Sequence, residues 1–196
     1  MLKRLNAKHV NILIFGLLFI LCSCTKENEI TPSDEPDQIV VLFETSFENN
    51  NNPDITAWNL FYDYYSGVPY DTVVSSDCPG GGQWALNLKA QKLHFSYAEK
   101  YLTNFSGNKF LSLSCYATLN SGQNSATVSL SQIRNGLTIK NKEINLGVWN
   151  NWEKFTIRDT LNLVPADSIR IKFKGSGSTY ESSDFIIDLV KLEELL

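Results

Sequence analysis

Histidine is nearly absent from this 196-residue sequence, which contains two histidines. His9 lies in an N-terminal segment that we expect to be removed, so His94 is the one histidine of the remaining chain. The sequence also lacks a nucleophile elbow and a paired-histidine metal motif, and Gly80-Gly81-Gly82 precedes a predicted strand, unlike a phosphate-binding loop. These absences predict a protein that is not an enzyme. They leave a glycosidase open, because such an enzyme needs only two well-placed carboxylates and the chain has sixteen acids from Glu44 to Glu194.

Positive charge is also in deficit. The chain has 17 Lys and Arg against 21 Asp and Glu, a net charge of −4. The first 23 residues carry three cations and no acid, so their removal leaves 14 cations against 21 acids, or −7. Such a chain lacks the basic composition typical of nucleic-acid-binding domains, and we predict no nucleic-acid partner.

Long apolar runs are missing as well. The longest, from Ile12 to Cys22, is shorter than the ~20 residues that a membrane-spanning helix needs. It follows three cations and ends in Leu21-Cys22-Ser23-Cys24, which is the order of a signal peptide. The sequence Leu21-Cys22-Ser23-Cys24 resembles the lipobox of bacterial lipoproteins. The resemblance implies that residues 1–23 are removed and that Cys24 is lipidated, the alternative being an ordinary secretory signal.

Residues 24–38 are polar and rich in proline and acids, so they cannot bury enough apolar surface to fold and are expected to form a flexible tether. The lysine and acids after Cys24 resemble lipoproteins of Bacteroides-type bacteria, in which such residues accompany export to the outer face of the outer membrane. This resemblance implies an outer-membrane protein, lipid-anchored at the cell surface; the periplasmic leaflet is the alternative.

Two cysteines remain in the rest of the chain, Cys78 and Cys115. Exported compartments allow disulfides to persist. A bridge between these two would close a loop of 37 residues (78 to 115) and stabilise the fold by roughly 3 to 4 kcal/mol in the chain-entropy model. The alternative is a pair of buried free thiols.

Helical patterns are scarce between Ile39 and Leu196, a stretch of 158 residues that is long enough for one domain with a core. Short alternating or β-branched runs are separated there by Gly, Asn, Ser and Asp. They predict an all-β fold, a single antiparallel β-sandwich over residues 39–196. The clearest runs are Ile39–Phe47, Trp84–Lys89, Phe110–Leu119, Ala126–Ile133, Leu137–Leu146, Glu153–Leu163, Ser168–Lys174 and Phe185–Glu193.

Alternation within these runs predicts which side chains face the core. The residues predicted to face inward are Leu111, Leu113, Cys115, Ala117, Leu119, Ala126, Val128, Leu130, Ile169, Ile171 and Phe173. Those predicted to face outward include Arg170, Lys172 and Lys174, and a hydroxyl stripe of Thr127, Ser129 and Ser131. This stripe, with Gln132 and Arg134 and next to Tyr116 and Tyr180, is a candidate ligand surface on a concave sheet face.

The last run is apolar on both faces except for Asp188 and Lys191, which predicts a central strand. A matching acidic and apolar run, Leu42–Glu48, opens the folded region. We expect the two ends of the domain to pair in one sheet.

Several spaced residues carry a family resemblance. They are Phe47-Glu48, Trp58, Pro79–Gly82 before Trp84–Leu88, Trp149, Trp152–Thr156, and Phe185–Leu192. Together they resemble the galactose-binding-like jelly-roll domains that include many carbohydrate-binding modules. The resemblance covers nearly all of residues 39–196 and implies a jelly-roll fold and a glycan ligand.

The same resemblance implies a structural calcium ion where an early Glu and a late Asp meet. Glu48 and Asp188 are the matching positions, and Glu44 and Asp184 are weaker candidates. Carboxylate oxygens are suitable calcium ligands. The alternative is that Asp188 accepts backbone hydrogen bonds or pairs with a lysine, as most buried acids do.

The segment Trp58–Asp71 is rich in aromatic residues, with six in the thirteen positions from Trp58 to Tyr70. Flat rings stack on the apolar face of a sugar while amides and carboxylates bind its hydroxyls. The resemblance implies that Trp58 packs inside. The predicted ligand-binding residues are Phe61, Tyr62, Asp63, Tyr64, Tyr65 and Tyr70, together with Arg134 of the hydroxyl stripe. Alternatively, most of these rings pack the sandwich and a loop that closes over it.

The sequence therefore predicts a non-catalytic lipoprotein that binds a polysaccharide. A structural or protein-interaction subunit of a cell-surface or adhesion assembly, with an outer-membrane protein as partner, is the alternative. It would use the same fold and the same aromatic segment.

Overall fold

The computed structural model describes residues 38–63, 72–121, 125–147, 150–179 and 182–196. The chain divides into two compact units, Met1–Glu35 and Pro36–Leu196, and every described residue belongs to the second. Within the described ranges, no helix has the length and apolar character needed to cross a membrane. The expected signal peptide, Cys24 and most of the tether lie outside these ranges, so the lipid anchor stays a prediction.

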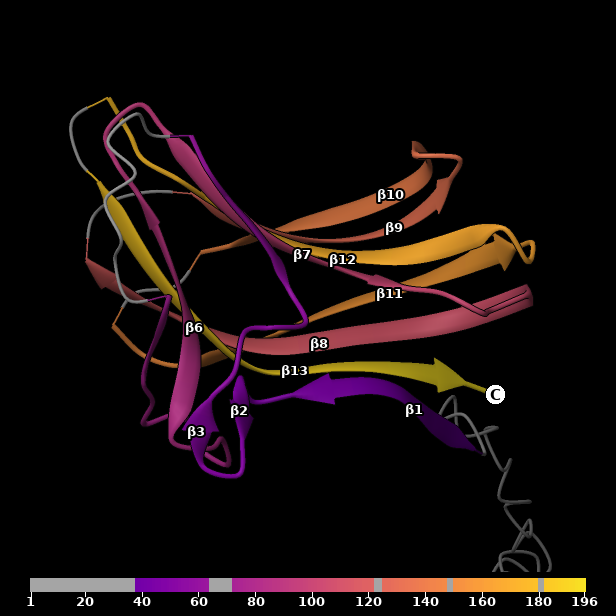
Figure 1. Cartoon of the computed structure of the whole chain (residues 1–196), viewed down its shortest axis with the longest axis horizontal. Helices are drawn as coiled ribbons and strands as arrows, with labels where there is room; N and C mark the ends of the chain where they lie inside the picture. Colours follow the sequence, from indigo (N-terminus) through magenta and orange to yellow (C-terminus); the bar gives the residue numbers. More distant parts are fainter. Residues whose placement is uncertain (1–37, 64–71, 122–124, 148–149, 180–181) are drawn as a thin grey trace, which may run out of the picture. The chain divides into compact units, whose positions relative to one another are not determined.

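The second unit consists of two stacked antiparallel sheets and a separate two-stranded sheet of β2 and β3 (Figure 1). The six-stranded sheet has the order β11-β8-β13-β6-β5, with β1 also paired to β13, and the five-stranded sheet has the order β10-β9-β12-β7-β4. The prediction of an antiparallel β-sandwich is confirmed. The strands are β1 (Ile39–Thr45), β2 (Glu48–Asn49), β3 (Asn52–Pro53), β4 (Asn59–Tyr62), β5 (Val73–Ser75), β6 (Trp84–Ala90), β7 (Phe95–Leu102), β8 (Gly107–Ser121), β9 (Ala126–Arg134), β10 (Leu137–Leu146), β11 (Glu153–Leu163), β12 (Asp167–Ser176) and β13 (Ser183–Leu195).

The hydrophobic core lies between the two sheets. All the residues predicted from alternation to face inward on β8, β9 and β12 are buried. Trp58 is buried too, with its ring centroid 5.6 Å from that of Phe47 and 5.7 Å from that of Phe173. The expectation that Trp58 packs inside is therefore confirmed. Because Phe173 belongs to β12, Trp58 ties the segment before β4 to the centre of the five-stranded sheet.

The two ends of the domain meet as predicted. β1 pairs with β13 from Ile39 opposite Leu195 to Thr45 opposite Val190. β13 lies between β8 and β6, so it is a central strand. Its register shifts between Asp188 and Lys191, where Leu189 has a φ of 49°. A residue with left-handed backbone conformation at such a bulge bends the strand and changes the direction of the neighbouring side chains.

Cys78 and Cys115 are buried free thiols, so the disulfide is not formed and the alternative holds. Cys115 points from β8 into the core, whereas Cys78 lies beside Gly81 and Asp188. Asp188 is paired with Tyr116, the neighbour of Cys115 on β8, and therefore faces the opposite side of the sheet. The sheet thus separates the two sulfur atoms. Burial raises the pKa of both thiols to about 12, so they stay protonated at neutral pH.

Candidate ligand-binding site

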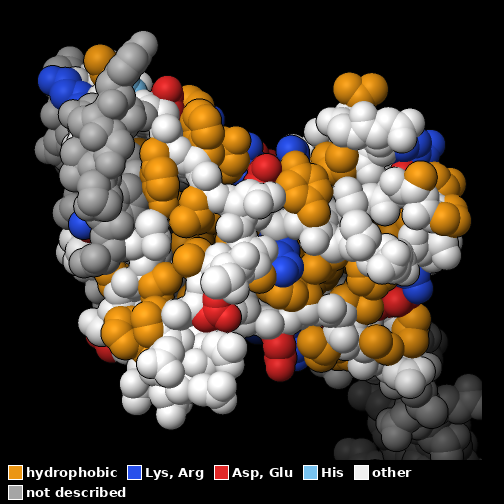
Figure 2. All heavy atoms as spheres, in the orientation of Figure 1, with side chains coloured by type: hydrophobic (Ala, Val, Ile, Leu, Met, Phe, Trp, Pro, Cys, Tyr) orange, Lys and Arg blue, Asp and Glu red, His pale blue; other side chains and the backbone are white. Residues whose placement is uncertain are grey.

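The outer face of the five-stranded sheet is concave (Figure 1), and the molecule is hollowed on this side (Figure 2). One wall of the hollow is mainly hydrophobic, and acidic and basic side chains gather at its base (Figure 2). Cross-strand register identifies the side chains of this face, because opposite residues in an antiparallel pair point the same way. They are Asn59 and Phe61 of β4, Phe95, Tyr97, Glu99 and Tyr101 of β7, Arg170, Lys172 and Lys174 of β12, Thr127, Ser129 and Ser131 of β9, and Asn141, Glu143 and Asn145 of β10.

Three aromatic rings, Phe61, Phe95 and Tyr97, form an aromatic cluster at one side of the concave face. The Phe61 ring lies 4.9 Å from Tyr97 and 5.7 Å from Phe95, with interplanar angles of 16° and 26°. Phe95 and Tyr97 are 6.4 Å apart and within 10° of parallel. Phe61 is 41% exposed. The cluster therefore presents nearly parallel rings to solvent rather than to the core.

The composition of β7 explains why its aromatic side chains face outward. Ser96 and Ala98 point into the sandwich and are 1% and 0% exposed. Ala98 lies opposite Phe173 on one neighbouring strand and opposite Leu60 on the other. Small side chains on the inner face leave room for these larger residues. The alternating aromatic positions are thereby left on the solvent side.

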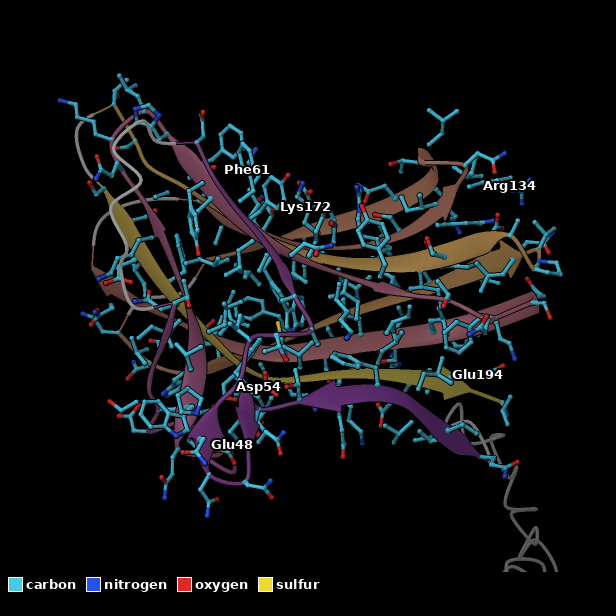
Figure 3. The ribbon with its side chains drawn as sticks, viewed as in Figure 1. Glu48, Asp54, Phe61, Arg134, Lys172 and Glu194 are labelled. Carbon is cyan, nitrogen blue, oxygen red and sulfur yellow. The ribbon has the colours of Figure 1, made fainter. Side chains whose placement is uncertain are left out.

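A cationic strip, defined as Arg170, Lys172 and Lys174, runs beside the aromatic cluster. The ammonium group of Lys172 lies 3.6 Å from the centroid of Tyr97, and that of Lys174 lies 4.8 Å from the centroid of Phe95. Such distances allow cation–π attraction. Burial is the main cause of a lowered pKa at Lys172 and of a raised pKa at Tyr97. Figure 3 shows Phe61 and Lys172 on the same side of the sheet.

Small polar side chains continue the face on β9 and β10. Ser131 donates a hydrogen bond to Asn141 Oδ1 at 2.6 Å, and Arg170 donates to Ser131 Oγ at 3.4 Å. The predicted hydroxyl stripe thus lies on this side of the sheet, next to the cationic strip, but Ser129 and Ser131 are only 3% and 0% exposed. Tyr116, which we expected beside it, belongs to the other sheet opposite Asp188 and Lys154, and Tyr180 lies outside the described residues.

A second candidate site lies at the hairpin β2–β3, on the other side of the sandwich (Figure 3). Asn50 and Asn51 both have positive φ angles, as a tight turn between short strands requires. This turn places Glu48 against the segment before β6, where Gln83 N–H donates to Glu48 Oε2 at 2.8 Å. Trp84 Nε1 donates to the Asn51 carbonyl at 3.1 Å and holds the hairpin in place.

Asp188 approaches the same segment from β13. It is fully buried and accepts hydrogen bonds from Ser76 Oγ at 2.8 Å and from Leu189 N–H at 2.7 Å. Burial raises the pKa of Asp188, and the negative charge of Glu48 raises it further. Within the described part of the chain, no Lys or Arg forms an ion pair with Glu48 or Asp188.

Two glycines leave room for these carboxylates. A Cβ atom on Gly81 would come within 2.5 Å of Asp188 Oδ2, and one on Gly82 would overlap the carboxylate of Glu48. The pair therefore fits a hard cation in its donor chemistry. The described residues contain no group of three or more Asp, Glu, His or Cys that could hold a metal, so backbone carbonyls or water would complete such a shell.

The two weaker acidic candidates lie elsewhere. Glu44 is opposite Lys191, whose pKa is raised mainly by its hydrogen bond to Glu193 and further by the charge of Glu44, whereas Glu48 is the acid that influences Asp188. Asp184 accepts a hydrogen bond from Asn120 Nδ2 at 3.1 Å and lies 3.9 Å from the Lys89 ammonium group. The structure thus brings Glu48 and Asp188 to one place and gives the other two acids different partners.

Neither a family model nor a curated protein matches the sequence. Solved structures do match the fold. The CBM22-1 xylan-binding domain from Paenibacillus barcinonensis aligns with a TM-score of 0.52 and 16% identity, over 82% of this chain and 96% of that domain. The family 11 carbohydrate-binding module from Clostridium thermocellum, solved with a mixed-linked tetrasaccharide, aligns with a TM-score of 0.51 and 13% identity, over 79% and 94%. The fold is that of β-sandwich carbohydrate-binding modules.

A further similar structure is the enzymatically active domain of tailspike protein 4 from bacteriophage CBA120. It aligns with a TM-score of 0.55 and 17% identity over 75% of this chain, but the match covers only 20% of that protein. Identities this low indicate a shared fold and nothing more specific. What the concave face binds has to be argued from its own side chains.

The aromatic residues predicted to bind ligand do not all lie on the same face of β4. Phe61 joins the aromatic cluster, whereas Tyr62 lies opposite the buried Ser96 and faces the other side of the sheet. Asp63 stays beside the cluster, because its N–H donates to the Phe95 carbonyl at 2.9 Å and its carboxylate lies 3.8 Å from His94 Nδ1. Tyr64, Tyr65 and Tyr70 lie outside the described residues.

Arg134 does not belong to the concave face. It donates from Nε to Asp167 Oδ1 at 2.7 Å and from NH2 to Asp167 Oδ2 at 2.9 Å. Gln132 donates to the same carboxylate at 2.7 Å. Figure 3 shows Arg134 at the end of the sheet, far from Phe61. Its guanidinium group pairs with Asp167 and joins β9 to β12, apart from the aromatic cluster.

The Asp167 network predicts an acid-sensitive contribution to stability. The hydrogen bonds from Arg134 hold the pKa of Asp167 far below its usual range, so the folded state favours the ionised carboxylate. This contribution is complete above the unfolded pKa of about 4 and is lost as the pH falls below that value. Asp167→Asn should therefore destabilise the protein at pH 7. In denaturant unfolding at pH 7 and pH 3, the difference from wild type should shrink at pH 3, and an unchanged difference would contradict this assignment.

Proposed function

We propose that this protein binds carbohydrate on the concave face of the five-stranded sheet, without catalysing a reaction. The observation that carries the proposal is the nearly parallel aromatic cluster on the outer face of the sheet, in which Phe61 is exposed and Phe95 and Tyr97 are half-buried. The apolar face of a sugar ring can stack on such rings, while the neighbouring asparagine and cationic side chains form hydrogen bonds with its hydroxyl groups. The fold shared with carbohydrate-binding modules supports this proposal.

A glycan array probed with the full-length protein tests the proposal. We expect at least one glycan to bind the wild type and to lose most of its signal with Tyr97→Ala. Phe110→Ala is the matched control, because Phe110 is 44% exposed but lies on the other sheet, opposite Thr160. Binding that Phe110→Ala weakens and Tyr97→Ala does not would place the site elsewhere. Absence of any bound glycan would favour the protein-interaction alternative.

Glu48 and Asp188 are proposed to hold a structural calcium ion. Two unpaired carboxylates that face one another across Gly81 and Gly82 repel each other, and a divalent cation would remove that repulsion. Calcium bound there would join the β2–β3 hairpin to the central strand β13. Its role would be stability, since the site lies apart from the concave face.

Thermal unfolding with and without calcium tests this proposal. Saturating calcium should raise the melting temperature of the wild type by about 5 °C or more over the value in chelator. Asp188→Asn keeps the size of the side chain and removes one charge, so it should abolish most of that increase. A wild type that is equally stable in calcium and in chelator would contradict the proposal.

The domain is proposed to be held at the outer membrane by a lipid on Cys24, with the cell surface as its location. The lipobox-like Leu21-Cys22-Ser23-Cys24 and the polar, acidic stretch after it support this proposal. A labelled fatty acid fed to expressing bacteria should be incorporated by the wild type and not by Cys24→Ala, and the variant should leave the membrane fraction. Equal membrane association of both proteins would contradict it.

A further inference from the structure

The concave face carries an excess of positive charge on an otherwise acidic domain. Residues 38–196 contain 13 Lys and Arg against 16 Asp and Glu, a net charge of −3. Of the residues assigned to the concave face, three are cationic and two, Glu99 and Glu143, are acidic. The local charge is therefore opposite in sign to that of the domain.

One acid is shared by much of the cationic strip. Glu99 lies 4.0 Å from Arg170 NH1 and 3.9 Å from Lys172 Nζ, both at the limit of an ion pair. It also accepts a long hydrogen bond of 3.3 Å from the Tyr101 hydroxyl. Lys174 forms no ion pair with any carboxylate of the described residues. Glu99 and Glu143, the two acids of this face, therefore balance two of the three cations and leave one net positive charge on the strip.

Arg170 has weak partners for its guanidinium group. Its bond to Ser131 Oγ is 3.4 Å long, its distance to Glu99 is 4.0 Å, and its Nε is a buried donor with no hydrogen-bond partner in the described structure. Arginine normally forms short, paired bonds to carboxylate or sulfate oxygens. A ligand oxygen at the exposed edge of this group would supply a stronger acceptor than the protein does.

From these contacts we infer that the glycan bound on the concave face is acidic, a polysaccharide whose carboxylate or sulfate groups pair with Arg170, Lys172 and Lys174 while its rings stack on Phe61 and Tyr97. The inference rests on the proposed function. Alternate residues of a strand are about 6.7 Å apart, so the strip extends over about 13 Å. A strip of this length can contact more than one acidic group of an extended chain.

Two pairs of polymers test the inference by isothermal titration of the full-length protein. Polygalacturonic acid is compared with its carboxyl-reduced form, and dextran sulfate with dextran, which distinguishes carboxylate from sulfate. At low salt we expect at least one acidic polymer to bind about tenfold tighter than its neutral partner, and the ratio to fall at high salt. Lys174→Met should lower the affinity for that acidic polymer. Lys154→Met, an exposed cation on the other sheet, should not.

The outcomes separate this inference from the proposed function. Neutral polymers that bind as tightly as acidic ones, with affinity lost in Phe61→Ala, would overturn the inference and leave glycan binding in place. If Phe61→Ala left the affinity for the acidic polymers unchanged, their binding would be general charge attraction, and this result would overturn the inference as well. Tighter, Phe61-dependent binding of single-stranded oligo(dT) than of either acidic polymer would assign the face to nucleic acid instead. Binding of none of these polymers, combined with an empty glycan array, would overturn both proposals.

Discussion

The double variant Phe61→Ala/Tyr97→Ala is expected to bind its glycan about a hundredfold more weakly than the wild type, since each lost ring removes on the order of 1 to 1.5 kcal/mol of stacking energy. Phe61 and Tyr97 are the closest pair of the aromatic cluster, at 4.9 Å. Tyr97 also lies under the Lys172 ammonium group at 3.6 Å, so its loss frees that cation to move. The affinity is measured by isothermal titration with a glycan that the array identifies.

Two controls distinguish the loss of a binding surface from the loss of the fold. Both replaced side chains lie on the solvent side of the sheet, so the double variant should keep the β-sheet circular dichroism of the wild type. Phe110→Ala should retain wild-type affinity, because that ring is equally exposed on the other sheet. If the double variant folded normally and bound within a factor of about two of wild type, the aromatic cluster would not be the binding surface.

Trp58→Ala is expected to lower the free energy of unfolding by about 3 to 5 kcal/mol, the usual cost of truncating a buried tryptophan. Trp58 is 7% exposed and packs against three rings, those of Phe43 at 6.1 Å, Phe47 at 5.6 Å and Phe173 at 5.7 Å. These rings belong to β1, the segment after it, and β12, so one cavity would loosen both sheets. Urea unfolding followed by circular dichroism measures the loss.

Trp152→Ala is the control for this variant. Trp152 is only partly buried, and its indole N–H donates one hydrogen bond of 2.7 Å to Asp77 Oδ1. We expect a loss of about 1 kcal/mol for that bond and a smaller packing change. A Trp58→Ala variant that is no less stable than Trp152→Ala would show that the centre of the core has been misplaced.

The fold could be predicted from the sequence where the core residues are large and alternate strictly. From Leu111 to Leu119 in β8 and from Ile169 to Phe173 in β12 every second residue is apolar and buried, so a period of two identified both strands and their inner faces. The pairing of β1 with β13 followed from the apolar character of the last strand. In each case the hydrophobic pattern and the burial agree.

β7 was missed because its pattern is inverted. Its inner positions include Ser96 and Ala98, and its outer positions include Phe95 and Tyr97, so hydrophobicity alone assigns the wrong face or no strand at all. The useful signal was the alternation of aromatic residues with small ones. In a strand whose neighbours supply large core side chains, as Phe173 does here, such alternation indicates rings that face solvent.

The acidic pair and the role of Arg134 depend on geometry that the sequence does not specify locally. Glu48 reaches the segment before β6 because of the tight β2–β3 turn, and Asp188 is aimed there by the bulge at Leu189. Arg134 meets Asp167 because β9 and β12 are neighbours in a register that places these two residues opposite one another. Strand order and register arise from the whole sandwich, so a linear reading treated Arg134 as a free surface cation.

The most direct test of glycan binding by the concave face is to map the bound ligand by amide chemical-shift changes in the full-length protein. With a glycan that the array identifies, the largest changes are expected in β4, β7 and β12, around Phe61, Tyr97 and Lys172. Changes confined to the outer face of the other sheet, around Phe110 and Lys154, would contradict the assignment of the binding site to the concave face.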